Sequence, residues 1–364
     1  MASVDQYEDL EALANAAGER GPEFEPGSKF WYSDAGADVL GAIVERASGI
    51  PLDEFVSERL LAPLGMEDSL YISDAGDPRL ERVASLYAGR MGEWTRFWGP
   101  EQEPFYPYAW GSQSLYATPL DYARFLTMWL DEGMSGDTRV LSAEAVARML
   151  TPTGPMGSLG SDAPYLTLYS DLVAHHGQMA ILYMDEEETG GDPVVLGYSG
   201  SDGTIAWAWP ERDLLILFFT QSRGGSSPLR LEAEIERLLL DPPEVPDAGV
   251  PAEYEDYLGT YAASFDQFRN EPFEVIWRDG ALALDIPSLF IFGLEPTDED
   301  GWWSLGDTGA AVSFATDEAG VVTGLGLRRG GETFDLPKGA PEMEPEPTLA
   351  PEEAERYLGW FREE

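Results

Sequence analysis

The first residues that could do chemistry are a tyrosine and a carboxylate two positions apart, within residues 29–49, KFWYSDAGADVLGAIVERASG. A phenol titrates near about pH 10 and needs a nearby positive charge to act as a base at neutral pH. Asp34 would work against this, because an anion beside Tyr32 disfavours the phenolate. Two interpretations of Tyr32 stay open: a group held at the mouth of a site, or an aromatic side chain that packs at the start of a helix.

A second candidate group is the run Tyr198, Ser199 and Gly200, at the end of a short apolar segment. This segment reads Gly-Tyr-Ser-Gly without a further glycine, so it lacks the Gly-x-Ser-x-Gly pattern that exposes a nucleophilic serine. Ser199 and Gly200 either line a groove or let the strand turn. Asp34 is likewise either a substrate ligand or the N-cap of the helix that follows it.

No cofactor or metal is expected from the spacing of the remaining groups. The chain has no cysteine, and its two histidines, His175 and His176, are adjacent. Neighbours on a strand point to opposite faces, so they are a poor metal pair, and a structural or surface role is expected for both. The sequence has no phosphate-binding glycine loop followed by lysine and no zinc-type spacing.

Composition excludes some classes of partner. The 364 residues carry a formal net charge of −45, and the lysines are Lys29 and Lys338. Such a polyanion repels nucleic acid and anionic membrane surfaces, so we expect neither as a partner. An acidic, highly solvated surface, suited to high salt, is the simplest interpretation. No apolar run is long enough to span a membrane and no secretory signal is visible, so the compartment is left open.

Helical periodicity dominates the first half of the chain. An acidic helix is expected over 5–17, a second helix over 39–47 that ends at Gly49, and a third from Pro51 to the segment APLGMEDS. Residues 72–112 read as loop, and their aromatic stretch 94–110 either walls a substrate site or anchors a long loop. Thr118 and Ser142 are predicted N-caps of helices that run to about residues 130 and 150.

Beyond residue 194 the periodicity changes to that of strands. Residues 194–200, 204–210 and 213–219 are predicted to be antiparallel strands, because tight loops join them. Trp207 and Trp209 share one strand face, which indicates packing in a core. A helix over 228–240 follows. Helices, an antiparallel sheet and a terminal helix against the sheet indicate an α+β layout.

The chain is predicted to hold two domains with a proline-rich linker between them. The first spans 1–240, the linker 241–252, and the second domain 253–338, with short strands typical of a small barrel. An acidic linker and a short terminal helix fill 339–364. The similar segments YLGTY at 257–261 and YLGWF at 357–361 are weak support for a repeat.

The segment FEPGSKFWYSDAGADVLGAIVERASGIPLDEFVSERLLAPLGMEDS resembles the central motif of the serine β-lactamase-like family, which includes class C β-lactamases, D,D-peptidases and esterases of the penicillin-binding-protein fold. Three later segments agree in order and spacing: GSQSLYATPLDYARF, VLSAEAVARMLTP and GYSGSDGTIAWAWPERDLLILFFTQS. The resemblance covers roughly residues 5–240. The β-domain that follows is similar to an appendage of many members.

The resemblance implies a two-step acyl transfer on a small-molecule or peptide acyl substrate: a serine attacks a carbonyl, and water or an amine releases the acyl group. In the family the nucleophile and a lysine come from Ser-x-x-Lys, and the tyrosine of Tyr-x-Asn shuttles the proton. Carried over by position, Tyr32 is the proton-shuttle tyrosine and Asp34 stands at the Asn position. Tyr198, Ser199 and Gly200 occupy the third, substrate-lining motif.

The departures from the family pattern shape the hypotheses. Pro26 and Asp335 stand three residues before the two lysines, so this sequence contains no Ser-x-x-Lys. Tyr198 stands where lysine or histidine is usual. The first hypothesis is therefore a β-lactamase-like domain, N-terminally incomplete and inactive alone, whose missing part comes from an upstream chain. A non-catalytic binding module for peptide or acyl ligands and a truncated inactive gene product are the alternatives. An exposed sheet edge would favour a complementing chain or self-association.

Overall fold

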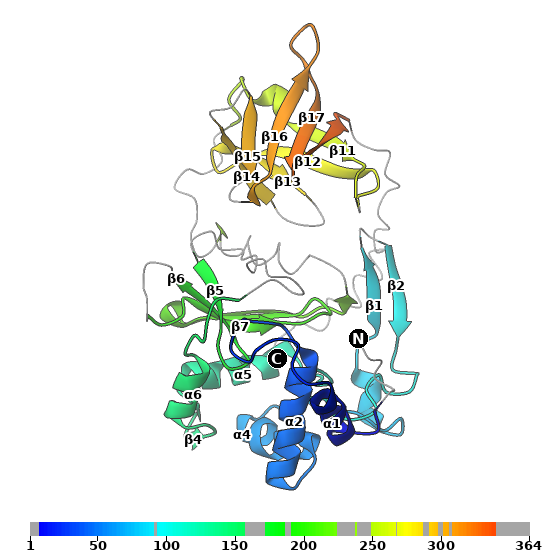
Figure 1. The fold of residues 1–364 in the computed structure, drawn as a ribbon, viewed down its shortest axis with the longest axis vertical. Helices are drawn as coiled ribbons and strands as arrows, with labels where there is room; N and C mark the ends of the chain where they lie inside the picture. Colours follow the sequence, from blue (N-terminus) through cyan, green and yellow to red (C-terminus); the bar gives the residue numbers. More distant parts are fainter. Residues whose placement is uncertain are drawn as a thin grey trace, which may run out of the picture. The chain divides into compact units, whose positions relative to one another are not determined.

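The computed structural model describes residues 7–90, 93–156, 172–185, 191–223, 237–238, 249–266, 268–286, 291–297, 301–305 and 308–339 (Figure 1). The chain forms two compact units, residues 1–228 and 229–364. The predicted helix 228–240, the predicted terminal helix and the second copy of the repeat lie wholly or largely outside the described residues. The predicted domain boundary at residue 240 therefore stays a prediction.

Two helices at the start of the first unit present the candidate tyrosine. Helix α1 (Leu10–Arg20) begins where the Asp9 carboxylate accepts the N–H of Ala12 at 2.8 Å. Helix α2 (Asp34–Ser48) begins at Ser33, whose hydroxyl accepts the N–H of Gly36 at 3.0 Å, and it ends at Gly49, which has a left-handed backbone with φ 76°. Both predicted helices are confirmed, with shifted bounds.

The third predicted helix is one continuous helical segment with a wide turn inside it. It comprises α3 (Leu52–Val56), the π-helical turn η2 (Ser57–Leu61) and α4 (Ala62–Leu64). Gly65, with φ 66°, ends it in the left-handed region that glycine enters without steric cost. A 3₁₀ turn, η3 (Pro78–Arg82), follows.

The later helices begin at the predicted caps. Helix α5 (Pro119–Leu130) starts at Thr118, and α6 (Ala143–Met149) starts at Ser142. A two-stranded ribbon, β3 (Met134–Ser135) and β4 (Thr138–Arg139), lies between them. Within the described part of the chain, no helix is long and apolar enough to cross a membrane.

The main sheet of the first unit is antiparallel throughout, in the order β5-β6-β7-β8-β9 (Figure 1). Its strands are β5 Leu172–His176, β6 Ile181–Asp185, β7 Val195–Ser199, β8 Ile205–Trp209 and β9 Leu214–Phe218. The three predicted strands are β7, β8 and β9, and two further strands extend the sheet beyond β7. The 3₁₀ turn η4 (Pro210–Arg212) joins β8 to β9.

Helix α5 covers one face of this sheet. Leu126 and Trp129 of α5 share a buried apolar cluster with Leu182, Leu196 and Ala206 from the strands. The opposite face is also buried, because every residue of β8 is inaccessible. Trp207 and Trp209 are each 2% exposed, which confirms their predicted packing in a core. The observed helices on an antiparallel sheet confirm the α+β prediction for this unit.

The segment expected to be loop contains a hairpin. Strands β1 (Leu86–Arg90) and β2 (Glu93–Trp98) pair antiparallel, and β1 also pairs in parallel with β10 (Ser222–Arg223). The hairpin escaped prediction because its alternation is broken: Trp94 and Phe97 are more than a third exposed, whereas Trp98 is buried. Its pairing brings Arg223 beside Ala88, far apart in sequence.

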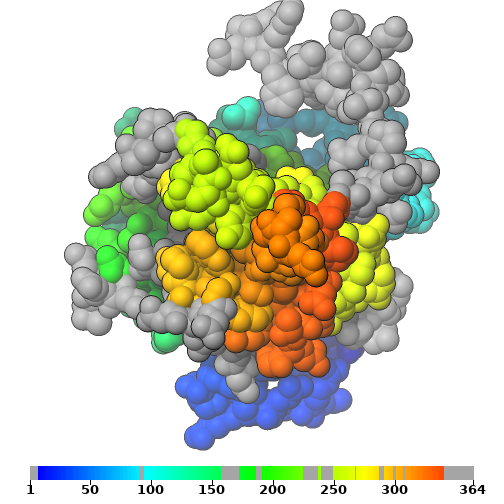
Figure 2. Space-filling view, turned by 90° about the horizontal axis from the view of Figure 1, so that it is seen from above, coloured from blue at the N-terminus to red at the C-terminus, as the bar shows by residue number. Residues whose placement is uncertain are grey.

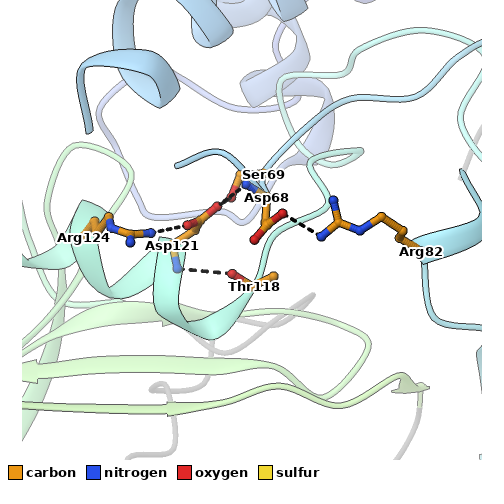
Figure 3. A network of polar contacts seen from close by, with 6 residues as sticks. All are labelled: Asp68, Ser69, Arg82, Thr118, Asp121 and Arg124. Carbon is orange, nitrogen blue, oxygen red and sulfur yellow. Dashed lines mark hydrogen bonds and ion pairs between the residues drawn. The ribbon is translucent and has the colours of Figure 1, made fainter. Parts of the chain in front are cut away.

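A buried carboxylate joins α5 to the segment that follows α4 (Figure 3). Asp121 is 2% exposed, and its Oδ2 accepts the N–H of Asp68 at 2.8 Å and the hydroxyl of Ser69 at 3.0 Å. Its Oδ1 pairs with Arg124 on the next helical turn. Thr118 closes the network by accepting the N–H of Asp121 at 3.3 Å. A buried charge is tolerated here because each oxygen has a donor.

The second unit is an eight-stranded antiparallel meander in the order β11 to β18 (Figure 1). The strands are β11 Gly259–Ala263, β12 Glu271–Arg278, β13 Ala281–Asp285, β14 Ile291–Pro296, β15 Trp302–Leu305, β16 Ala311–Thr316, β17 Val322–Arg329 and β18 Glu332–Pro337. The 3₁₀ turn η6 (Glu255–Tyr257) precedes them.

The meander almost closes into a barrel, as predicted. An antiparallel bridge joins Tyr261 to Lys338, and the N–H of Gly339 donates to the carbonyl of Thr260 at 2.9 Å. Figure 2 shows these strands, coloured yellow to red, packed into one body. Their inward residues form an apolar core that includes the fully buried Tyr261 and Phe273. Closure leaves few unpaired backbone groups at the sheet edges.

The Asp121 network generates a stability prediction. Asp121→Ala leaves the Asp68 N–H and the Ser69 hydroxyl without their acceptor, and we expect a loss of about 3 kcal/mol in the free energy of unfolding, measured by urea denaturation. Asp121→Asn keeps one acceptor oxygen and should cost less. The exposed Asp137→Ala is the control, and an Asp121→Ala variant as stable as this control would contradict the prediction.

Candidate active site

Tyr32 stands immediately before the cap of α2, where its side chain is 40% exposed. Its phenol makes side-chain hydrogen bonds with Asp34 on the first turn of α2 and with Tyr198 on β7. Two segments that are more than 160 residues apart in the sequence therefore meet at one hydroxyl. Three of the five predicted site residues come together here.

The surroundings of Tyr32 hold its proton in place. Burial of the phenol raises the pKa of Tyr32 far above its usual value, and Tyr198, the Asp34 charge and the hydrogen bonds to both raise it further. No cation offsets these effects among the charges that act on this phenol. These surroundings favour the neutral phenol of Tyr32, which can donate a hydrogen bond but neither gives up its proton readily nor acts as a phenolate base.

Helix α2 is locked against the segment 111–114, which continues the site. Asp38 is buried on α2, and its Oδ1 accepts the N–H of Ser112 at 2.9 Å. Gly111 lies so close to α2 that a Cβ there would come within 2.1 Å of the Ala37 carbonyl oxygen. Only glycine permits this approach, which sets the distance between the start of α2 and the loop that carries Tyr106 and Gln113.

That loop supplies a second buried phenol. Tyr106 is 8% exposed and donates to Oε1 of Gln113 at 2.7 Å. Burial, and next the charge of Asp202, raise the pKa of Tyr106 to about 12, and Arg223 partly opposes this. The charge of Asp34 also raises the pKa of Tyr106, so one carboxylate influences both phenols.

Aromatic rings fill the space around Tyr106. Phe105 stands edge-on to Tyr106 with ring centres 4.9 Å apart, and Tyr106 lies 6.3 Å from Trp110. Trp98 and Trp110 are buried, which favours the anchoring interpretation of the 94–110 segment for these residues. The substrate-wall interpretation stays open for Phe97, whose side chain is 37% exposed.

A charge pair closes the site on the side of the β7–β8 turn. Arg223 donates from Nε to Oδ1 of Asp202 at 2.8 Å and from a terminal nitrogen to Oδ2 at 3.1 Å. The same guanidinium lies over the rings of Phe97 and Phe105, at 5.4 and 6.0 Å from their centres. Both side chains are partly buried, at 37% and 23% exposure, so water weakens this pair less than a surface pair.

The structure separates the other predicted residues. Ser199 follows Tyr198 on β7, so its side chain lies on the opposite face of the sheet from the phenol that meets Tyr32. Gly200 belongs to the turn, where its N–H donates to the carbonyl of Thr204 at 2.8 Å. Of the two interpretations of Asp34, the helix cap is wrong: the N-cap of α2 is Ser33, whose hydroxyl accepts the N–H of Gly36 at 3.0 Å.

The adjacent histidines lie on β5, which is at the opposite end of the strand order from β9. The His176 ring packs 5.3 Å from Phe30, and burial lowers the pKa of both histidines. These observations fit the structural role expected for them. Within the described residues, no group of three or more potential metal ligands comes together.

Four functional candidates escaped the sequence reasoning: Tyr106, Gln113, Asp202 and Arg223. The aromatic density of 94–110 pointed to the loop but not to Tyr106 itself. Asp202 looked like a turn residue, and Arg223 carried no local signal. Its place beside the site depends on the parallel pairing of β10 with β1, which no short-range pattern encodes.

Known proteins match the region that carries this site. The sequence profile of the family described as Beta-lactamase matches residues 2–241, which is well over half of the chain. The chain belongs to the Beta-lactamase family. This confirms the resemblance and the fold that it implied, and it places Tyr32, Asp34 and Tyr198 inside the family region.

Curated relatives of this β-lactamase-family chain are similar over a shorter stretch. Protein Rv1367c of Mycobacterium tuberculosis is 37% identical over 131 residues, which is 35% of this chain and 31% of the relative. Penicillin-binding protein 4 of Amycolatopsis lactamdurans is 32% identical over 145 residues, 38% and 36% of the two chains. Lovastatin esterase of Penicillium rubens is 29% identical over 155 residues, 38% and 39%. The aligned region thus spans roughly a third of each curated relative's length.

A solved structure shares the fold over most of the chain. The octameric penicillin-binding protein homologue from Pyrococcus abyssi has a TM-score of 0.52 and 20% identity, and it covers 91% of this chain and 69% of its own. Members named for penicillin binding, D-alanyl-D-alanine carboxypeptidase activity and lovastatin esterase activity make this chain a relative of serine hydrolases.

The contact between Asp34 and Tyr32 predicts a titration. Asp34→Asn removes one of the negative charges that disfavour the phenolate, so the pKa of Tyr32 should fall towards its usual value. Carbon NMR of tyrosines labelled at Cζ follows each phenol as the pH is raised. Asp53→Asn is the matched control, because Asp53 raises the pKa of Tyr71 and does not act on Tyr32. An unchanged Tyr32 titration in Asp34→Asn would refute the assignment.

Asp38 predicts a pH dependence of stability. Burial raises the pKa of Asp38, so the folded chain binds its proton more tightly than the unfolded chain does. The stability that this provides is present below the unfolded pKa of about 4 and is lost as the pH rises through the raised folded pKa. Asp38→Asn keeps an acceptor for Ser112 and has no charge to bury. Its melting temperature should therefore exceed that of the wild type at pH 7, with the gap narrowing in acid; parallel melting curves at every pH would count against this.

Proposed function

We propose that this chain forms the proton-transfer and substrate-binding side of an acyl-transfer site, and that the 364 residues alone do not form a covalent acyl-enzyme. The observation that carries the proposal is the environment of Tyr32: a neutral phenol between Asp34 and Tyr198, in a sequence without Ser-x-x-Lys. Acyl transfer through serine needs both a nucleophile and a group that removes its proton. Among the described residues, the groups that act on Tyr32 are Asp34 and Tyr198, and neither is a serine nucleophile or a cation that could activate one.

The names of the relatives support a class of substrate. Penicillin-binding proteins, D-alanyl-D-alanine carboxypeptidases and lovastatin esterase act, by their names, on or with β-lactams, D-alanyl peptides and esters. The shared feature is a carbonyl that a serine can attack. Tyr32 would donate a hydrogen bond to the acyl ligand, and Tyr198 and Gly200 would border the acyl chain.

A non-catalytic binding module is the second candidate, and a specific observation favours it. Asp34 and Tyr198 hold the proton on Tyr32, which suits recognition by hydrogen bonds better than base chemistry. Such a module would bind acyl or peptide ligands without turning them over. A truncated inactive gene product remains the third alternative, and it would bind neither.

A partner would restore the missing groups. Strand β9 pairs with β8 on one side, and within the described residues no strand pairs with its other side. Its leucines are only partly buried. An added strand could bond this edge, supplied by residues upstream of Met1, by a separate chain or by self-association.

Covalent labelling tests the proposal. The 364-residue chain is incubated with a fluorescent penicillin and with a fluorophosphonate, and its intact mass is measured. We expect no adduct, while an active penicillin-binding protein in the same tube is labelled. A stoichiometric adduct on a serine of this chain would overturn the proposal. Binding of acyl ligands, followed by NMR of the labelled tyrosines, would then separate a binding module from an inactive product, which should show no shifts.

A further inference from the structure

The ion pair between Asp202 and Arg223 borders the phenols of the candidate site. Arg223 contacts Asp202 through two nitrogens, at 2.8 and 3.1 Å, and it lowers the pKa of the nearby Tyr106. Arginine typically recognises a carboxylate by two parallel hydrogen bonds, and Arg223 already makes both of them to Asp202. While Asp202 occupies it, Arg223 is not available to a carboxylate on a ligand.

The backbone holds both partners in place. The carbonyl of Asp202 accepts the Thr220 hydroxyl and the N–H of Ser222, each at 2.9 Å. Gly203 has φ +85°, and a Cβ there would come within 2.2 Å of the Thr220 hydroxyl. Arg223 lies on β10, paired with β1. The pair therefore exists before any ligand arrives.

The other face of the guanidinium is covered as well. The rings of Phe97 and Phe105 lie 5.4 and 6.0 Å from its central carbon. An arginine between a carboxylate and aromatic faces is stabilised by both, so displacing it is costly. To reach Arg223, a ligand carboxylate would have to break the hydrogen bonds between Arg223 and Asp202. Otherwise it would lie near the Asp202 carboxylate with no cation of its own to pair with.

Acidic groups act on the phenols of the site. Asp34 acts on Tyr32 and on Tyr106, and Asp202 acts on Tyr106 and Tyr116. With Arg223 paired to Asp202, Asp34 is the other charged group among the described residues that acts on these phenols. A second carboxylate brought to within a few ångströms of it is repelled, and burial strengthens this repulsion.

We propose that Asp202 is a specificity-determining residue: by holding Arg223, it makes the site select acyl ligands without a free carboxylate, such as neutral esters and amides, over their acid counterparts. The inference rests on the proposed function and narrows its substrate class: it favours neutral esters and amides over penicillins and D-alanyl peptides, which carry a free carboxylate. It predicts that releasing Arg223 turns the site towards anionic ligands.

Two ligands that differ in one group test this in the full chain. N-acetyl-D-alanine carries a free carboxylate, and N-acetyl-D-alaninamide replaces it with a neutral amide. Shifts of the labelled Tyr32 and Tyr106 resonances report the dissociation constant of each. The wild type should bind the amide more tightly than the acid. In Asp202→Asn the ratio should move by about tenfold or more in favour of the acid, a change typical of one charge-assisted pair gained.

A second variant should shift the relative affinity for the acid and the amide in favour of the amide. Arg223→Gln leaves the Asp202 charge unpaired, so discrimination against the acid should increase. A purely structural role of the pair would change both variants in the same direction. Asp202→Asn keeps the main-chain carbonyl that Thr220 and Ser222 bond, which preserves the turn. Asp77→Asn is the matched control: it breaks a similar two-nitrogen pair, with Arg79, and should leave the ratio unchanged.

Each outcome decides something. Opposite shifts in Asp202→Asn and Arg223→Gln support the inference. Ligand binding with the same acid-to-amide ratio in wild type and both variants overturns the inference and leaves the proposed site standing. Absence of binding by either ligand, in wild type and variants alike, overturns the proposed substrate site and this inference with it.

Discussion

The close approach of α2 to the 111–114 segment is the constraint on which the site depends. Gly111 touches the Ala37 carbonyl, and Asp38 accepts the N–H of Ser112 from the buried face of the helix. The helix start carries Tyr32 and Asp34, and the segment continues the loop with Tyr106. A side chain at Gly111 would push these halves apart, and the shared influence of Asp34 on both phenols would be lost. A carboxylate is buried to hold this contact, although its burial raises the pKa of Asp38.

The electrostatics of the site favour neutral phenols. Burial is the largest cause that raises the pKa values of Tyr32 and Tyr106. Asp34 raises both further, Asp202 raises that of Tyr106, and Arg223, although it is paired with Asp202, partly opposes the rise in Tyr106. The chain has a net charge of −45, so acidic groups are common in it. The balance of charges around these two phenols also depends on where Asp34, Asp202 and Arg223 lie. It separates hydrogen-bond donation, which these neutral phenols can perform, from proton transfer through a phenolate, which is disfavoured without a cation close to them.

Local signals were reliable where they act within a few residues. Thr118 and Ser142 cap the helices they were predicted to cap, and the apolar runs around Trp207 form strands of the main sheet. The family pattern located Tyr32, Asp34 and Tyr198, which the structure brings together. Prediction failed for the hairpin of β1 and β2, whose polar and aromatic residues alternate poorly, and for the cap of α2, where Ser33 outcompetes its neighbour Asp34.

By itself the sequence determined the family, the N-caps of α5 and α6, the barrel-like second domain and the absence of Ser-x-x-Lys, because each depends on residue type at short spacing. Only the tertiary structure decided that Arg223 pairs with Asp202, that Tyr106 joins Tyr32 around Asp34, and that Ser199 points away. These relations depend on β10 pairing with β1 and on the alternation of β7. Contacts between distant segments are set by packing and strand register, and neither can be read from one short segment of the sequence.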